Sequence, residues 1–480
     1  MYAYLERFGD NKALIYTVLA GMVAGFAVMA IPYRNFWLAF FGFFAVAVVL
    51  CNYKAGLYLM VPLIMVEPQK FVFTTSHSMP SDFVGIFYPV AILAFVSWTL
   101  RKLSKIPGGL ERETPNVEYF ILFIISWSAL TLLWAPGAEH GLLNWIRLLG
   151  NAIVFYLMVN AVKDEGTHRT IINIIFISAF VIAIASFLSV TIYHYRNYEF
   201  TWKVADFVTF NLNWFVFEQI YNPRAQGFVA HNTVAAIMNF TMALVFARLM
   251  TVKKLMPKVI LFAFLIMMGV AHLYTKSRGA LVGGFIMWMF LIAAIPWVRK
   301  RYVKNLALFF LVFLSVFVTV NHEDVFGEGS RFSASTSEYS IHKRISWWIK
   351  GYGFLEEKSG LVGLGAGGLK YYFDPLGIPH AHNVYLSFLF DFGVIGFVAV
   401  AVFIGYLFAK FYPVLVNSEK TYIQTMLWGS IGGLVAMGTH GLIDGEYNMS
   451  MLWFFLGLAV AALKLSKIEI RNRVRAESTA

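Results

Sequence analysis

Apolar stretches of about 20 residues recur along almost the whole chain, and they constrain its fold more than any other feature. Backbone polar groups in a bilayer must be paired within the protein, so such stretches predict transmembrane helices. A transmembrane barrel would show alternating polar and apolar residues, which the chain lacks. With 59% hydrophobic and 13% charged residues, the composition excludes an ordinary soluble domain. We therefore predict an all-α, polytopic integral membrane protein with about 12 to 14 transmembrane helices.

The expected spans follow one another with short connections and no internal repeat. The first apolar run starts at Ala13, after a polar segment, and is long enough to span, so no cleavable signal is expected. The second and third runs lie close together. In an alternative interpretation they form one re-entrant unit and not two spans. The expected spans are 13–31, 36–52, 54–66, 83–100, 117–135, 142–162, 170–193, 229–249, 257–275, 279–298, 304–321, 383–410, 422–443 and 449–464.

Basic residues gather in alternate connections, which sets the expected orientation. These connections fall on one side of the membrane, which the positive-inside bias identifies as the cytoplasm, together with both termini. The same bias accounts for the net charge of +12, so no nucleic-acid partner is expected. The single cysteine, Cys51, excludes an internal disulfide. The basic segments are 101–112, 163–169, 253–258, 299–304 and 464–475.

Three longer segments are then extracytoplasmic, at 67–82, 193–228 and 322–381. The last is too long for a simple connector, and its part 341–355 predicts an amphipathic helix on the membrane surface, with Trp347 and Trp348 in the interface. The chain thus divides into an N-terminal transmembrane bundle (1–321), a large outer loop (322–381), and C-terminal transmembrane helices with a cytoplasmic tail (382–480).

Cations at the outer ends of spans oppose the positive-inside trend and therefore need a reason. One possible reason is an anion site, because arginine binds phosphate oxygens in a bidentate manner. Snorkelling to lipid headgroups or helix capping is the other. The residues concerned are Arg224, Lys276, Arg278 and Arg344.

A His-Asn pair starts the span that follows the long loop, in the pattern H-N-x9-G-x-x-G. His382 can exchange a proton near neutral pH, although a structural histidine is the alternative. Asn383 either orients it or caps the helix. Asp391 lies about 13 Å deeper along the helix and is expected to be a buried structural acid. Gly393 and Gly396 are expected to permit close helix packing.

Three further patterns give no indication of a cofactor. The glycine-rich run 363–368 lacks the Gly-Lys-Ser/Thr ending of a P-loop and predicts a flexible turn. Asp444 and Glu446, with His440 nearby, could coordinate a hard cation, but an acidic turn is the simpler interpretation. His380 and His382 alternate without an accompanying carboxylate cluster in the sequence. We therefore expect neither a metal nor a cofactor.

Taken in order, these segments resemble the O-antigen ligase/polymerase superfamily, which comprises bacterial multispan glycosyltransferases. The resemblance covers 224–396, and Arg147, at an outer helix end, resembles an arginine of relatives. The motifs are Arg224 to Phe228 with Asn232 following, Ser277-Arg278-Gly279, Arg344 to Trp348, Gly363 to Gly365, and His382 to Gly396.

The resemblance implies a GT-C-like glycosyltransferase of the bacterial inner membrane whose active site faces the periplasm. Its donor would be an undecaprenyl-pyrophosphate-linked glycan, and its acceptor lipid A-core or another glycan. Arg224 and Arg278 would hold the pyrophosphate, assisted by Arg344, Lys276 or Arg147. His382 would be the general base, with Asn383 beside it, and no metal would be needed.

The sequence is compatible with four functions. O-antigen ligation is favoured narrowly, while repeat-unit polymerisation and protein O-glycosylation differ from it only in the acceptor. A lipid-linked oligosaccharide transporter belongs to another class. It predicts charges along a midplane pathway and related halves, whereas the charges here gather at the outer ends.

Overall fold

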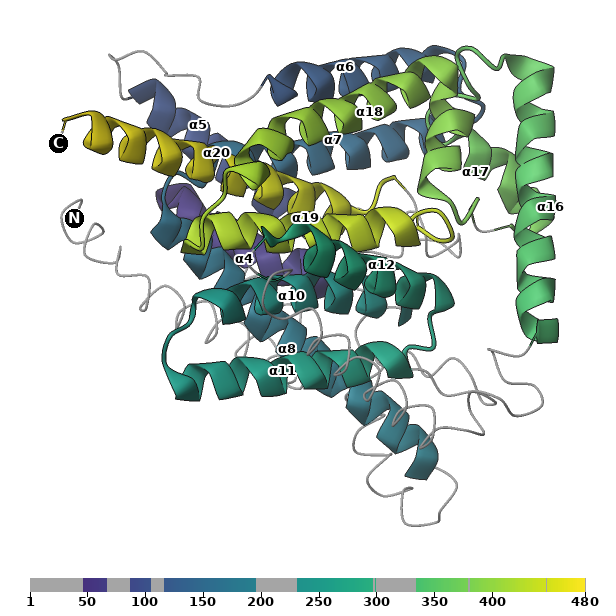
Figure 1. The fold of residues 1–480 in the computed structure, drawn as a ribbon. Coiled ribbons are helices and arrows are strands. Elements are labelled where there is room, and N and C mark those ends of the chain that lie inside the picture. The colour runs from purple at the N-terminus through teal and green to yellow at the C-terminus, as the bar shows by residue number, and fades with distance from the viewer. Residues whose placement is uncertain are drawn as a thin grey trace, which may run out of the picture.

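The computed structural model describes residues 46–66, 87–104, 116–195, 231–296, 298, 334–378, 380–445 and 447–479. Every regular element in these ranges is a helix, which confirms the all-α fold (Figure 1). The elements are α4 (Tyr53–Val66), α5 (Phe87–Ser104), α6 (Val117–Leu130), η2 (Thr131–Leu133), α7 (Ala138–Ala161), α8 (Glu165–Tyr195), α10 (His231–Thr251), α11 (Leu255–Tyr274), α12 (Arg278–Ala294), α16 (Ala334–Lys358), α17 (Gly368–Phe373), η3 (Asp374–Leu376), α18 (Val384–Val416), α19 (Tyr422–His440) and α20 (Ser450–Thr479).

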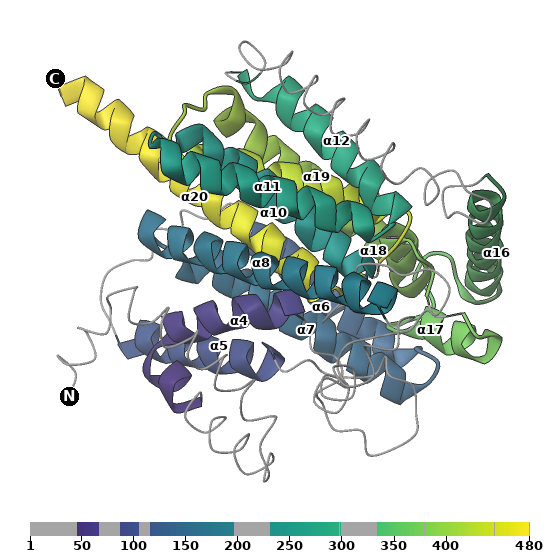
Figure 2. The same ribbon diagram turned by 90° about the horizontal axis from the view of Figure 1, so that it is seen from below.

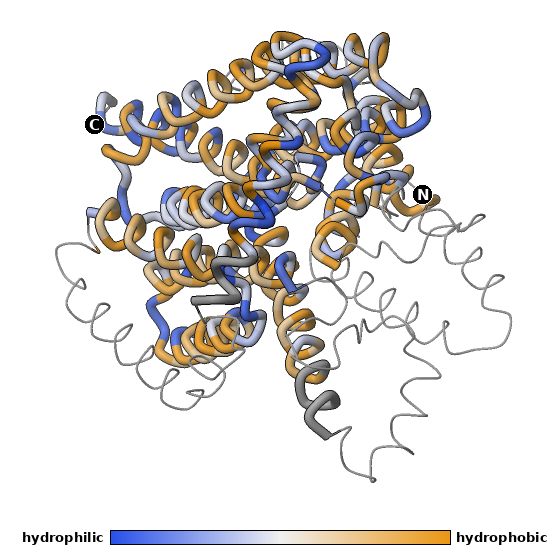
Figure 3. The backbone as a smooth tube through the Cα atoms, turned by 90° about the vertical axis from the view of Figure 1, so that its right-hand side faces the viewer, coloured by the Kyte–Doolittle hydropathy of each residue, from blue (hydrophilic) through white to orange (hydrophobic). Residues whose placement is uncertain are grey.

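The described helices form a multi-pass membrane bundle. Six of them are long and apolar enough to cross a bilayer, and four shorter apolar helices accompany them. Apolar residues dominate these helices along their length (Figure 3). The predicted total of spans stays a prediction, because the expected spans 13–31 and 304–321 lie outside the described residues.

The core is built around α19, which packs against α10, α12 and α20. Small residues let these helices approach closely, as is common within membranes. A Cβ added at Gly283 of α12 would lie 2.6 Å from the carbonyl oxygen of Ala436 on α19. One added at Gly433 of α19 would lie 2.3 Å from the ring of Phe240 on α10.

The helix α16 lies crosswise at one end of the bundle, whereas the C-terminal end of α20 lies at the opposite end (Figures 1 and 2). The predicted helix 341–355 is confirmed and is longer than expected, with 25 residues. The two ends of the bundle are therefore distinct, and the predicted site residues next to α16 belong to the end opposite the basic tail.

The long helix α18 is interrupted at Gly393, whose φ of 66° and ψ of −170° are not helical. The backbone of the outer loop fills the interruption: the amide of Val394 donates to the carbonyl of Gly360 at 3.0 Å. A Cβ at position 393 would lie 2.3 Å from the carbonyl oxygen of Leu361. Gly393 therefore permits close approach of a loop, and not of a second helix as predicted.

The glycine-rich run forms turns, as predicted, but it is buried and hydrogen-bonded to α18. Its amides are paired with α18: Leu364 donates to the carbonyl of Phe390 at 2.8 Å, and Gly365 donates to that of Asp391 at 2.9 Å. These bonds satisfy carbonyl groups that the helix interruption leaves open. The run thus anchors the outer loop in the bundle.

Asp391 is buried and structural, as predicted. Its carboxylate accepts hydrogen bonds from the amides of Gly367 at 3.1 Å and Leu369 at 2.8 Å, and from the hydroxyl of Tyr447 at 2.6 Å. A buried carboxylate needs such partners, because desolvation of an unpaired charge is costly. Asp391 therefore fixes the start of α17 and the region before α20 against α18.

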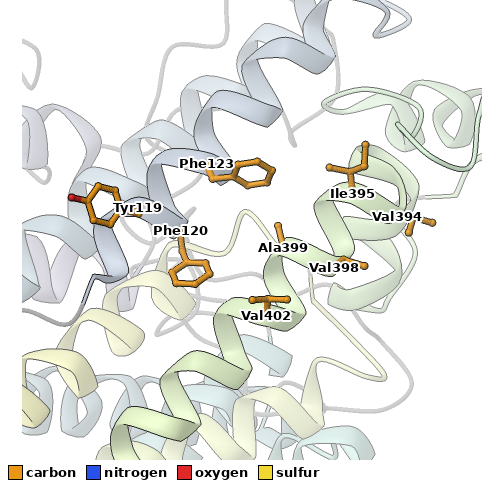
Figure 4. Close-up of a pocket in the computed structure, with 8 residues that line it drawn as sticks. All are labelled: Tyr119, Phe120, Phe123, Val394, Ile395, Val398, Ala399 and Val402. Atoms are coloured by element: carbon orange, nitrogen blue, oxygen red, sulfur yellow. The ribbon is translucent and has the colours of Figure 1, made fainter.

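An apolar groove of about 610 Å³ lies between α6 and α18 (Figure 4). It offers mainly hydrocarbon and aromatic surface, and the hydroxyl of Tyr119 is the one polar side-chain group among its lining residues. Its lining residues are Tyr119, Phe120, Phe123, Val394, Ile395, Val398, Ala399 and Val402.

Candidate active site

His382 lies in the short segment between the outer loop and α18. Its φ of 51° is left-handed, which is uncommon for a residue other than glycine and costs free energy. Directly after it, Asn383 caps α18, because its Oδ1 accepts from the amide of Leu386 at 2.9 Å. The backbone reverses at His382 so that its ring stays at the end of the bundle while α18 enters it.

The start of α18 is tied to the turn that follows α19. The Nδ2 of Asn383 donates to the carbonyl of Leu442 at 3.0 Å, and the amide of Val384 donates to that of Gly441 at 2.8 Å. The cap interpretation of Asn383 is thus confirmed, while its predicted part in substrate binding stays a prediction. These bonds set the register that brings Asp444 beside His382.

Asp444 is the direct partner of His382. The Nδ1 of His382 lies 2.6 Å from Oδ1 of Asp444 and donates to it. The side-chain amide of Asn232, at the start of α10, donates to the other carboxylate oxygen. Both oxygens of a buried carboxylate are therefore hydrogen-bonded, as a stable buried charge requires.

The Asp444 carboxyl group stays ionised in this environment. Burial alone would raise its pKa, but the hydrogen bond from His382 and the nearby rings of His440 and His380 hold the pKa below its ordinary value. An ionised carboxylate accepts the Nδ1 proton and fixes the tautomer of the imidazole. The ring nitrogen left for proton transfer is then Nε2 of His382.

Three more histidines surround this pair. The Nε2 of His380 lies 3.2 Å from Nδ1 of His382 and 3.6 Å from Oδ1 of Asp444. The Nε2 of His440 lies 4.0 Å from Oδ2 of the same carboxylate. His231, at the start of α10, interacts electrostatically with Asp444.

Two of the predicted arginines lie next to each other at the same end. Arg278 donates to the hydroxyl of Ser340 at 2.9 Å and interacts electrostatically with Arg344. Burial lowers the pKa of the Arg344 guanidinium, while the Asp444 carboxylate acts in the opposite direction. Two guanidinium groups close together are unfavourable unless an anion offsets them, so the pair favours an anion at this place.

The turn before α12 completes this part of the site. Lys276 is buried there with a φ of 52°, and Ser277 occupies the N-cap position of α12 without a side-chain capping bond, directly ahead of Arg278. The next residue, Gly279, lies against the ring of His440, because a Cβ there would be 3.0 Å from Cδ2. The Ser-Arg-Gly motif thus places the arginine beside Ser340 of α16, while its glycine leaves room for His440.

The helix α16 covers the site through its two tryptophans. The ring of Trp347 stacks on that of His382, with centroids 5.2 Å apart. The indole N–H of Trp348 donates to the carbonyl of Ala381 at 2.7 Å. Both tryptophans thus contact the segment that carries His382, and their predicted place in the membrane interface stays a prediction.

The structure brings together His382, Arg278 and Arg344 and places Lys276 in the adjoining turn. Arg224 and Glu446 lie outside the described residues. Arg147 is half-buried on α7, and its part in donor binding stays a prediction.

Asp444 was predicted only as a member of an acidic turn, and its pairing with His382 was not predicted. No spacing rule relates it to His382, which lies 62 positions earlier. The available signal was an acidic residue, Asp444, in a short turn next to His440. That signal becomes informative only once the start of α18 is known to bond to the turn after α19.

The fold and site define a multi-pass membrane protein with a histidine–carboxylate pair beside two arginines at one end of the bundle. The O-antigen ligase family model matches residues 262–401, a segment that includes Arg278, Arg344 and His382. This match confirms the resemblance to the O-antigen ligase superfamily and supports a glycosyltransferase-type role on lipid-linked glycans. No curated protein matches the chain.

Proposed function

We propose that the protein moves an undecaprenyl-pyrophosphate-linked glycan onto an acceptor hydroxyl at the periplasmic face of a bacterial inner membrane, with lipid A-core as the favoured acceptor. The observation that carries the proposal is the 2.6 Å contact between Nδ1 of His382 and Oδ1 of Asp444, next to Arg344. It supplies a base with a defined tautomer beside a site for an anion.

The reaction follows from these groups. Nε2 of His382 takes the proton of the acceptor hydroxyl as its oxygen bonds to the anomeric carbon of the donor. The bond from that carbon to the pyrophosphate oxygen breaks, and undecaprenyl pyrophosphate leaves. Arg278 and Arg344 stabilise the charge that develops on the leaving group, assisted by Arg224, Lys276 or Arg147. Asp444 acts as a positioning residue, because it holds the ring and stabilises the imidazolium that forms.

The test uses the purified full-length protein with a lipid-pyrophosphate-linked glycan and EDTA. Lipid A-core and a second lipid-linked glycan are offered as acceptors in separate reactions. We expect transfer to lipid A-core, and a reduction of about 10²- to 10⁴-fold for His382→Ala. His342→Ala, which alters an exposed histidine on α16, is the matched control and should retain activity.

Each acceptor distinguishes one alternative. A ladder of products on the lipid carrier would make the protein a polymerase, and transfer to a protein hydroxyl would make it a protein glycosyltransferase. An intact donor with every acceptor, together with movement of the lipid-linked glycan across vesicles, would contradict the proposal in favour of a transporter.

A further inference from the structure

Three histidines from two segments of the chain converge on the Asp444 carboxylate. His380 and His382 precede α18, and His440 ends α19. One ligand atom from each of His380, His382 and Asp444 lies within 4.8 Å of the others. We propose that these four side chains form a site for a zinc-class transition-metal ion, and that its occupancy inhibits the enzyme.

The separations of the ligand atoms are close to those that a tetrahedral zinc ion imposes. Zinc bonds of about 2.0–2.2 Å place neighbouring ligand atoms about 3.3 Å apart. The Nε2 of His380 lies 3.2 Å from Nδ1 of His382 and 3.6 Å from Oδ1 of Asp444. The 2.6 Å contact between His382 and Asp444 must open, and the 4.0 Å separation of His440 from Asp444 must close, before all four side chains bind one ion.

His440 provides an independent reason to place a ligand here. Its side chain is 9% exposed, and its Nε2 lies 4.0 Å from Oδ2 of Asp444. Within the described part of the chain this nitrogen has no hydrogen-bond partner. A buried polar atom without a partner is costly, and coordination of a cation that also binds Asp444 would satisfy it.

The donor set determines which cations fit. Imidazole nitrogens suit zinc, nickel and copper, whereas magnesium and calcium require mainly oxygen ligands. Three imidazoles with one carboxylate therefore favour a zinc-class ion. Arg344 lies close enough to Asp444 to oppose a bound cation, so we expect reversible occupancy rather than a permanent structural metal.

Inhibition follows because the metal binds Nδ1 of His382, and this step rests on the proposed function. A neutral imidazole carries one proton. In the active form Nδ1 of His382 carries it and donates to Asp444, which leaves Nε2 as the base. A metal on Nδ1 leaves that proton on Nε2. The ring then has no free nitrogen with which to accept the proton of the hydroxyl.

The experiment uses full-length protein without a polyhistidine tag, treated with EDTA and then freed of the chelator. Calorimetry with zinc chloride measures binding, and magnesium chloride is the control cation. We expect a single zinc site that EDTA empties, and no magnesium binding. His380→Ala should weaken zinc binding by at least about tenfold, because even loss of an outer-shell group has an effect of that size. His440→Ala should do the same, and His342→Ala should leave the affinity unchanged.

Transfer is then measured in the same samples. Zinc should abolish it, EDTA should restore it, and His380→Ala should shift the inhibition to higher zinc concentration. No zinc binding, or equal binding to wild type and His380→Ala, would overturn the site. If His380→Ala weakens zinc binding but zinc does not reduce transfer by the wild type, the proposed inhibition is overturned. Variant-sensitive zinc binding by a protein that transfers nothing even in EDTA would retain the metal site and count only against the proposed function.

Discussion

Nδ1 of His382 donates to Oδ1 of Asp444 across 2.6 Å, although 62 positions separate the two residues. The acid approaches from the turn after α19, and the base from the segment before α18. Because the second carboxylate oxygen is bonded to Asn232, the acid has one orientation relative to the ring. A substitution at Asp444 can therefore test the role of its carboxylate while His382 stays in place.

Asp444→Asn should reduce kcat by about 10²-fold with little change in the KM for the donor. The amide keeps the shape of the carboxylate, but it stabilises an imidazolium less well. It also points an N–H₂ group either at His382 or at the N–H₂ group of Asn232. Steady-state kinetics with the purified protein measures the effect. An unchanged kcat would show that Asp444 does not position the base.

The double variant Asn232→Asp/Asp444→Asn tests the same relationship by rescue. It exchanges donor and acceptor between the two side chains and lets the amide oxygen face Nδ1 of His382. We expect kcat to recover at least about tenfold relative to Asp444→Asn. A purely structural defect would be aggravated by the second substitution, so failure to recover would oppose the positioning role.

Arg278→Ala and Arg344→Ala should each lower kcat/KM for the donor by about 10- to 100-fold, since a charge-assisted hydrogen bond contributes about 1.5–3 kcal/mol. Lysine at either position should restore part of the loss, because it keeps the charge without the planar fork. Lys350→Ala, an exposed cation on α16, is the control and should have little effect. Equal effects of all three substitutions would indicate general membrane electrostatics instead of an anion site.

Gly393→Ala should destabilise the protein, whereas Gly405→Ala in the same helix should not. At 393 the left-handed backbone costs about 1–3 kcal/mol with any side chain, and the new Cβ would meet the carbonyl of Leu361. At 405 nothing lies within 4 Å of the added carbon. Thermal unfolding in detergent compares the two variants. Equal melting temperatures would contradict the described interruption of α18.

Trp348→Phe should loosen α16 from the segment that carries His382. The substitution removes the bond from the indole N–H to the carbonyl of Ala381, which contributes about 1 kcal/mol. We expect faster amide hydrogen exchange at 381–383 and transfer reduced by several-fold. Ile349→Ala alters an exposed neighbour and is the control. Unchanged exchange would show that this tryptophan does not hold the site.

Hydropathy predicted most of the described helices, because the length of an apolar run and the thickness of a bilayer are both properties that a sequence reveals. The expected spans 54–66 and 422–443 correspond to α4 and α19. The structural role of Asp391 was also predictable, since a carboxylate two turns inside an apolar helix must be paired.

The interruption of α18 was not predictable from the same pattern. The sequence around Gly393 is as apolar as any continuous helix, and glycine fits both a packing interface and a left-handed turn. The deciding partner is the loop backbone at 360–365, which fills the gap. Such long-range backbone pairing leaves no periodic trace in the sequence.

The sequence by itself determined that this chain crosses a membrane repeatedly, and it singled out His382, Arg278 and Arg344 as candidate site residues through their order and surroundings. Only the tertiary structure decided that Asp444, and not another acid, is the partner of His382, and that α16 covers the pair through Trp347. The physical reason is one of range. Hydropathy is a property of consecutive residues. The hydrogen bond between His382 and Asp444 depends instead on how α18 and α19 pack together, with α10 and α16 beside them.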